Sequence, residues 1–205
     1  AIAAAAKQAE ELPEEQREAA ARVPLALYVQ ARLRLLIGEK EAAHTLLDRA
    51  YDDGDPHPQV LKLLAELRLK EGDEAGATAL YRRAYALWPM ETVWAKLLVE
   101  RYLAAGDEAG LVEPLEQLAG LEVDNGVIRK KLAQLALKRR DFAAAAHWAE
   151  ACLQIDVADA EMQRFAAVAQ TLQAEHALAA SHYAAAVELR PTELGWRVEW
   201  ARSLQ

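Results

Sequence analysis

Residues 70–89 read KEGDEAGATALYRRAYALWP, and the start of this stretch returns 34 residues later. The pentapeptide GDEAG at residues 72–76 recurs unchanged at residues 106–110. A period of 34 residues with small side chains at fixed offsets is typical of a helix–turn–helix unit that is stacked many times. The sequence therefore predicts a chain of helical repeats.

The same period runs through residues 24–205 without an insertion. It predicts five repeats, at 24–57, 58–91, 92–125, 126–159 and 160–193, followed by the first helix of a truncated sixth repeat at 194–205. Residues 1–23 do not follow the period, and their composition predicts a separate, non-standard helical segment. We expect the natural protein to continue beyond Gln205.

Small side chains recur at the eighth and twentieth positions of the repeats, where they allow two helices to approach closely. These positions hold Ala31, Ala65, Val99, Ala133, Ala167 and Ala201, and then Ala43, Ala77, Leu111, Ala145 and Ala179. Position fifteen is glycine in three repeats, and an acid follows it in all five. Glycine there predicts the end of the first helix, and the acid favours the start of the second. The expected helices are 25–37, 41–52, 58–70, 74–87, 92–104, 108–119, 126–139, 142–154, 160–172 and 176–188.

This pattern resembles the tetratricopeptide-repeat family, over nearly nine tenths of the chain. The resemblance implies an all-α fold, a right-handed α-solenoid of stacked antiparallel helix pairs, with the first helices lining a concave groove. It also implies a protein-binding function. One departure is position four, where Ala95, Arg129 and Gln163 replace a large apolar residue and the large residue stands one place earlier.

Repeat three departs further from the pattern. It has Leu111 and Leu118 where the other repeats have small residues, and it places Pro114 inside the expected helix 108–119. A proline within a helix costs about 3 kcal/mol. We therefore expect the largest packing irregularity of the protein at residues 111–118.

Composition excludes several classes of function. The net charge of −8 argues against general nucleic-acid binding, which uses a basic surface. No apolar run approaches the roughly 18 residues of a membrane span, so no membrane insertion is expected. The sequence assigns no cellular compartment.

The search for catalytic chemistry finds no candidate. The five histidines form no i, i+4 pair, and no glycine-rich phosphate loop is present, so no metal, cofactor or catalytic residue is predicted. Cys152 is the only cysteine, and its small-residue position predicts a buried structural thiol. The chain is not expected to be an enzyme.

Basic side chains recur at position five, which faces the groove in the family. Four successive repeats place Lys62, Lys96, Lys130 and Arg164 there. We predict that these bases, with Lys138, recognise an acidic segment of a partner, and that Leu69, Leu103 and Leu137 supply apolar contact. The alternative is that they are ordinary solvated side chains, because exposed charge pairs are common and weak.

The leading hypothesis is a scaffold that holds a protein or peptide segment in its groove without catalysis. A second hypothesis is a structural accessory arm of a larger protein, possibly an enzyme, or an arm that self-associates through Trp196, Trp200 and Leu204. An intrinsic enzyme is the third, and it lacks a supporting constellation of residues.

Overall fold

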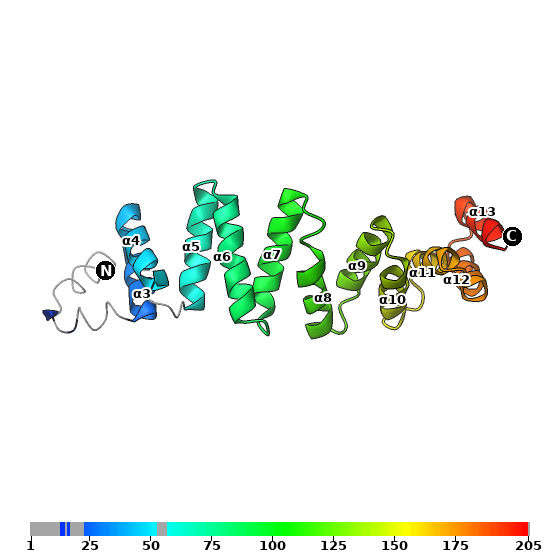
Figure 1. Ribbon diagram of the computed structural model, residues 1–205, viewed down its shortest axis with the longest axis horizontal. Helices are drawn as coiled ribbons and strands as arrows, with labels where there is room; N and C mark the ends of the chain where they lie inside the picture. The colour runs from blue at the N-terminus through cyan, green and yellow to red at the C-terminus, as the bar shows by residue number, and fades with distance from the viewer. Residues whose placement is uncertain (1–12, 15, 17–22, 53–56, 205) are drawn as a thin grey trace. The chain divides into compact units, whose positions relative to one another are not determined.

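The computed structural model describes residues 13, 14, 16, 23–52 and 57–204, and these residues form α-helices and no strand (Figure 1). The helical segment predicted at residues 1–23 lies almost wholly outside the described residues. The chain divides into two compact units, Ala1–Arg101 and Tyr102–Gln205, and the division falls within helix α7.

The first unit holds two antiparallel helix pairs and most of α7 (Thr92–Ala105). The pairs are α3 (Pro24–Leu36) with α4 (Lys40–Asp52), and α5 (Pro58–Lys70) with α6 (Glu74–Leu87). The first helices α3 and α5 begin with proline, whose missing N–H has no intrahelical partner at that position. These two first helices also contact each other.

The second unit contains six helices that pack in chain order. They are α8 (Val112–Leu121), α9 (Gly126–Lys138), α10 (Phe142–Leu153), α11 (Ala160–Leu172), α12 (His176–Leu189) and α13 (Leu194–Ser203). The first helices α9 and α11 contact each other, as α3 and α5 do in the first unit. Every predicted helix except α8 agrees with the observed bounds to within one residue.

Helix α8 corrects the prediction for repeat three. It begins at Val112 instead of residue 108, so Pro114 is its third residue and lies in the first turn. A helix that began at residue 108 would need an N–H from Pro114 for the Gly110 carbonyl, and proline has none. Residues 108–111 form a turn instead, so the expected cost of an interior proline does not arise. The irregularity does lie in repeat three, where Leu111, Leu115 and Leu118 are buried.

All five turns between paired helices use the same hydrogen bond. The acid after position fifteen donates its backbone N–H to the carbonyl five residues earlier, at 2.9 Å in each repeat. The residue at position fifteen takes a positive φ, which glycine adopts without steric cost: Gly38, Gly72 and Gly106 have φ of 87°, 82° and 67°. Arg140 and Ala174 occupy the same position in repeats four and five, with φ of 61° and 63°.

Replacing Ala174 by glycine should raise the free energy of unfolding by about 1 kcal/mol, because a left-handed backbone costs a residue with a Cβ about that much. Urea unfolding followed by circular dichroism measures the change. The matched control is Ala79→Gly on the exposed face of α6, which should lower the free energy by about 1 kcal/mol. Equal destabilisation by both substitutions would show that the positive φ carries no strain.

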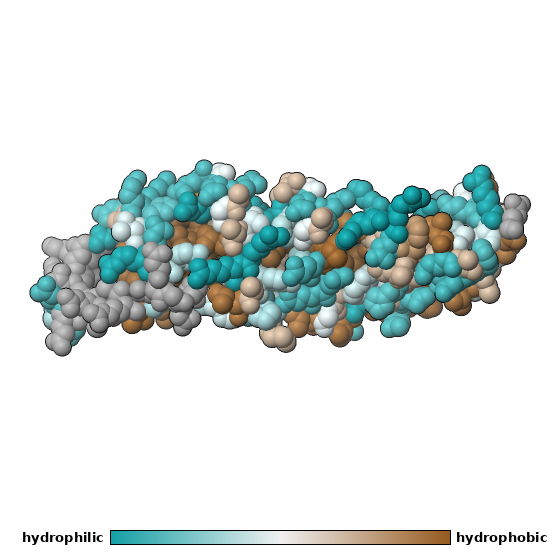
Figure 2. All heavy atoms as spheres, viewed as in Figure 1, coloured by the Kyte–Doolittle hydropathy of each residue, from teal (hydrophilic) through white to brown (hydrophobic). Residues whose placement is uncertain are grey.

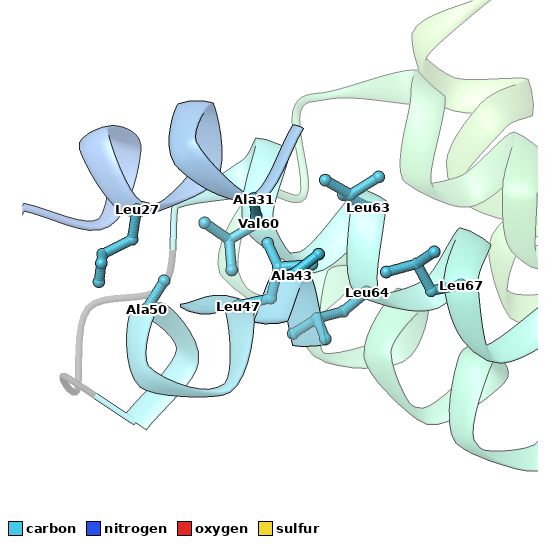
Figure 3. Packing of buried hydrophobic residues seen from close by; sticks show 9 residues of the cluster. All are labelled: Leu27, Ala31, Ala43, Leu47, Ala50, Val60, Leu63, Leu64 and Leu67. Carbon is cyan, nitrogen blue, oxygen red and sulfur yellow. The ribbon is translucent and has the colours of Figure 1, made fainter. Parts of the chain in front are cut away.

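The core is built from the small and large positions that the repeat pattern predicts. Every alanine at position eight or twenty is fully buried except Ala201, which is exposed. Figure 3 shows how α3, α4 and α5 share one cluster in the first unit: Leu27, Ala31, Ala43, Leu47, Ala50, Val60, Leu63, Leu64 and Leu67. At position three, Trp94, Ile128 and Met162 are buried, which explains how polar residues are tolerated at position four.

Hydrophilic side chains cover most of the described surface on the face drawn in Figure 2, with hydrophobic patches between them. Within the described ranges, no helix has the length and apolarity needed to cross a bilayer. The function of the chain must therefore be sought in the side chains that the first helices present.

Candidate functional site

The position-five bases are carried by first helices of both units. Lys62 lies on α5 and Lys96 on α7 in the first unit, while Lys130 lies on α9 and Arg164 on α11 in the second. The surroundings of these side chains differ between the units, and that difference decides which of them can meet an external anion.

In the second unit, Lys130 forms an ion pair with the buried Asp159 carboxylate. Asp159 also caps α11, since its Oδ1 accepts a hydrogen bond from the Met162 N–H at 3.3 Å. The hydrogen bond from Lys130 to Asp159 raises the pKa of the lysine above its usual value. Lys130 thus joins α9 to the start of α11.

Arg164 is held in the same manner by the next first helix. Its Nε and Nη2 each donate to the Glu199 carboxylate on α13, both at 2.8 Å. This hydrogen bonding raises the pKa of the guanidinium. The Trp196 ring lies 5.9 Å from the Arg164 guanidinium carbon, and Arg190 approaches the same ring at 5.7 Å. A bidentate arginine–carboxylate pair is among the stronger charged contacts, so Arg164 already has an anion.

In the first unit, Lys62 lines a pocket between α3 and α5. The lining residues are Tyr28, Arg32, Gln59, Lys62, Leu63 and Glu66. Arg32 Nη1 donates to the Tyr28 hydroxyl at 3.1 Å, and its guanidinium carbon lies 5.9 Å from the centre of that ring. Among the residues that the structure describes, neither Arg32 nor Lys62 forms an ion pair. Lys62 is half-buried, whereas Lys96 on α7 is exposed.

The other predicted contact residues are divided. Leu103 is exposed over 52% of its surface, and Leu69 is half-buried. Leu137 packs against the core cluster of α9, α10 and α11. Lys138 donates to Glu108 at 2.7 Å. Of the three leucines, Leu103 presents the most surface to a partner.

Sequence reasoning did not identify Arg32, Asp159 and Glu199 as parts of these sites. Arg32 stands four residues after Tyr28, a spacing that places both on one helical face and could have indicated the pair. Asp159 immediately precedes α11, which is the usual place for a capping acid. Glu199 carries no comparable signal, because its partner is contributed by the neighbouring repeat.

The chemistry of the described residues gives no support for a nucleophile. Cys152 is only 1% exposed, and burial raises the pKa of its thiol, which disfavours the reactive thiolate. Within the described ranges, no group of three or more histidine, cysteine, aspartate and glutamate side chains is arranged to hold a metal ion.

A histidine in the second unit links stability to pH. Burial lowers the pKa of His182 below its ordinary value, and His182 Nδ1 lies 2.6 Å from Gln163 Oε1. Because the folded-state pKa is depressed, the stability due to this group is present above a pH of about 6.5 and is lost as the pH falls through the folded-state pKa.

We expect the free energy of unfolding to fall as the pH is lowered from 7.5 to 5, by less in a His182→Gln variant than in the parent chain. The difference cannot exceed about 1.4 kcal/mol per pH unit for one group. Urea titrations across that range measure it. Identical pH profiles for the two chains would contradict the role given to His182.

The predicted self-association surface on α13 is only partly exposed. Trp196 and Trp200 are half-buried, whereas Leu204 is 64% exposed. Leu194 and Val198 on the same helix are 67% and 50% exposed. The exposed apolar area of α13 therefore consists mainly of aliphatic side chains.

Comparison with known proteins reveals the fold. No protein-family model and no curated protein sequence matches the chain. Among solved structures, the chain is similar to MamA AMB-1 with a TM-score of 0.54 and 21% identity, over 82% of this chain and 92% of that one. It is similar to YrrB, described as a TPR protein with an unusual peptide-binding site, with a TM-score of 0.51 and 12% identity. That match covers 87% of this chain and 92% of YrrB. The described part of the chain thus has the tetratricopeptide-repeat fold that its sequence resembles.

Proposed function

We propose that this chain is a non-catalytic scaffold that binds a segment of a partner protein along its first helices. The observation that carries the proposal is that first helices contact each other within each unit, α3 with α5 and α9 with α11, and repeat the same surface positions. Such a row offers an extended segment equivalent contacts at successive repeats. A peptide-binding site is attributed to YrrB, which shares the fold.

The proposed partner segment is acidic, because bases recur at position five. Lys62 is the favoured contact among the bases, since Lys130, Arg164 and Lys138 each pair with a carboxylate of the chain itself. Leu103 is the favoured apolar contact because more than half of its surface is exposed. Exposed charge pairs contribute at most about 1 kcal/mol each, so apolar contact must supply much of the affinity.

A photo-crosslinking amino acid placed on first and second helices tests the proposal. Lys96 on α7 and Gln134 on α9 are exposed positions on first helices. Ala79 on α6 and Ala143 on α10 are exposed positions on second helices of the same two units, and they serve as matched controls. In cells that express the protein, we expect crosslinked partners at the first-helix positions. Crosslinks only at Ala79 and Ala143 would reverse the assignment of the binding face.

A second candidate function is self-association through α13, as in an accessory arm. It is favoured by the exposure of Leu194, Val198 and Leu204 on that helix. Sedimentation velocity over a hundredfold concentration range should reveal a dimer that Val198→Lys disrupts. A monomer at every concentration would remove this candidate.

A further inference from the structure

We propose that the pocket between α3 and α5 in the first unit binds a single carboxylate group. This inference rests on the proposed function, because it names the chemical group through which a partner segment would engage the first helices. The pocket is lined by Tyr28, Arg32, Gln59, Lys62, Leu63 and Glu66, and its volume is about 80 Å³. One water molecule takes up about 30 Å³ in the liquid, so the space suits a carboxylate better than a ring or a whole side chain.

The charges that line the pocket do not balance. Arg32 and Lys62 are two bases, and Glu66 is the one acid among the lining residues. Neither base forms an ion pair with a described residue, although Lys62 is half-buried. A monoanion would bring the local charge to zero, whereas a phosphate dianion would exceed it. The charge balance thus favours a carboxylate over a phosphate group.

The pocket also supplies hydrogen-bond donors. The Tyr28 hydroxyl accepts from Arg32 at 3.1 Å, which leaves its own proton available for donation. Arg32 has five N–H donors and uses one of them on Tyr28, which also stacks beneath the guanidinium carbon. Lys62 and the exposed amide of Gln59 add further donors. A carboxylate has about four acceptor sites, and these groups can satisfy them.

The equivalent bases of the second unit show what such a site holds once it is filled. Lys130 is paired with Asp159, and Arg164 is paired with Glu199, so each has a carboxylate. In both cases the carboxylate comes from the start or the body of the next first helix. Lys62 stands at the same repeat position without such a partner, and we infer that an external carboxylate takes that place.

Nuclear magnetic resonance of the labelled full chain tests the site with defined probes. Sodium acetate, a blocked hexaglutamate peptide and inorganic phosphate are titrated separately while the side-chain signals of Arg32, Gln59 and Lys62 are followed. We expect acetate or the peptide to shift these signals, and phosphate to bind more weakly than acetate. Shifts with the peptide alone assign the carboxylate to a protein segment, and shifts with acetate alone assign it to a small carboxylate.

Two variants and a matched control test specificity. Lys62→Gln and Arg32→Gln should each weaken binding of the effective probe about tenfold. Lys70→Gln removes the same charge from an exposed position of α5 outside the pocket, and it should weaken binding less than twofold. Equal weakening by Lys62→Gln and Lys70→Gln, tighter binding of phosphate than of acetate, or no shift with any probe would overturn the site. Because acetate requires no partner protein, this result stands apart from the crosslinking test of the scaffold function.

Discussion

Replacing Trp94 by alanine should lower the free energy of unfolding by about 3–5 kcal/mol, the usual range for removal of a buried tryptophan. Trp94 is 2% exposed, and its ring lies 5.9 Å from that of Trp88. Its Nε1 donates to Glu91 Oε2 at 3.0 Å, so the substitution leaves both a cavity and an unpaired carboxylate oxygen. Urea unfolding followed by circular dichroism avoids the loss of a tryptophan fluorophore.

The control for this experiment is Trp196, which occupies the same repeat position on α13. Trp196 is half-buried and contacts Arg164 and Arg190 through its ring face. Trp196→Ala should therefore cost less than Trp94→Ala. A larger loss for Trp196 would mean that its contacts with the two arginines outweigh the burial of the larger core side chain.

Replacing Asp159 by alanine should lower the free energy of unfolding by about 2–4 kcal/mol, because one carboxylate performs two functions. It caps the N-terminus of α11 and pairs with Lys130. Asp159→Asn keeps a capping oxygen and removes the charge, so it should cost less than Asp159→Ala. The difference between the two variants measures the cap.

A double-mutant cycle with Lys130→Gln measures the ion pair separately. We expect Lys130→Gln to have little further effect once Asp159 is alanine. If the two substitutions instead add fully, the Lys130–Asp159 pair contributes nothing to stability, and Lys130 would be better regarded as a solvated base available to a partner.

Much of the fold follows from the sequence because the period of 34 residues fixes where each helix begins and ends. Buried alanines such as Ala65 and Ala145, and the glycine turn at Gly72, repeat at constant offsets and have local causes. The start of α8 was mispredicted because the period was followed there and the backbone chemistry of Pro114 outweighed it.

The position-five register of the candidate site was readable from the sequence, but the partners of these bases were not. Glu199 reaches Arg164 from the next first helix, and no local pattern announces that contact. Arg32 and Lys62 are assembled from α3 and α5 by the packing of two repeats. Whether a repeated lysine is satisfied internally depends on such contacts, so a sequence pattern alone cannot separate a structural base from one that awaits a ligand.

The base–acid pairs of the second unit also bear on how such a chain can be rearranged. A constant period would permit repeats to be exchanged like identical bricks. Arg164 and Glu199, however, are supplied by adjoining repeats. A chimera that puts repeat one in place of repeat five would present Tyr28 to Glu199 and strand a half-buried carboxylate. The order of the repeats is thus part of the information that the sequence carries, and recombination that respects the period alone would lose it.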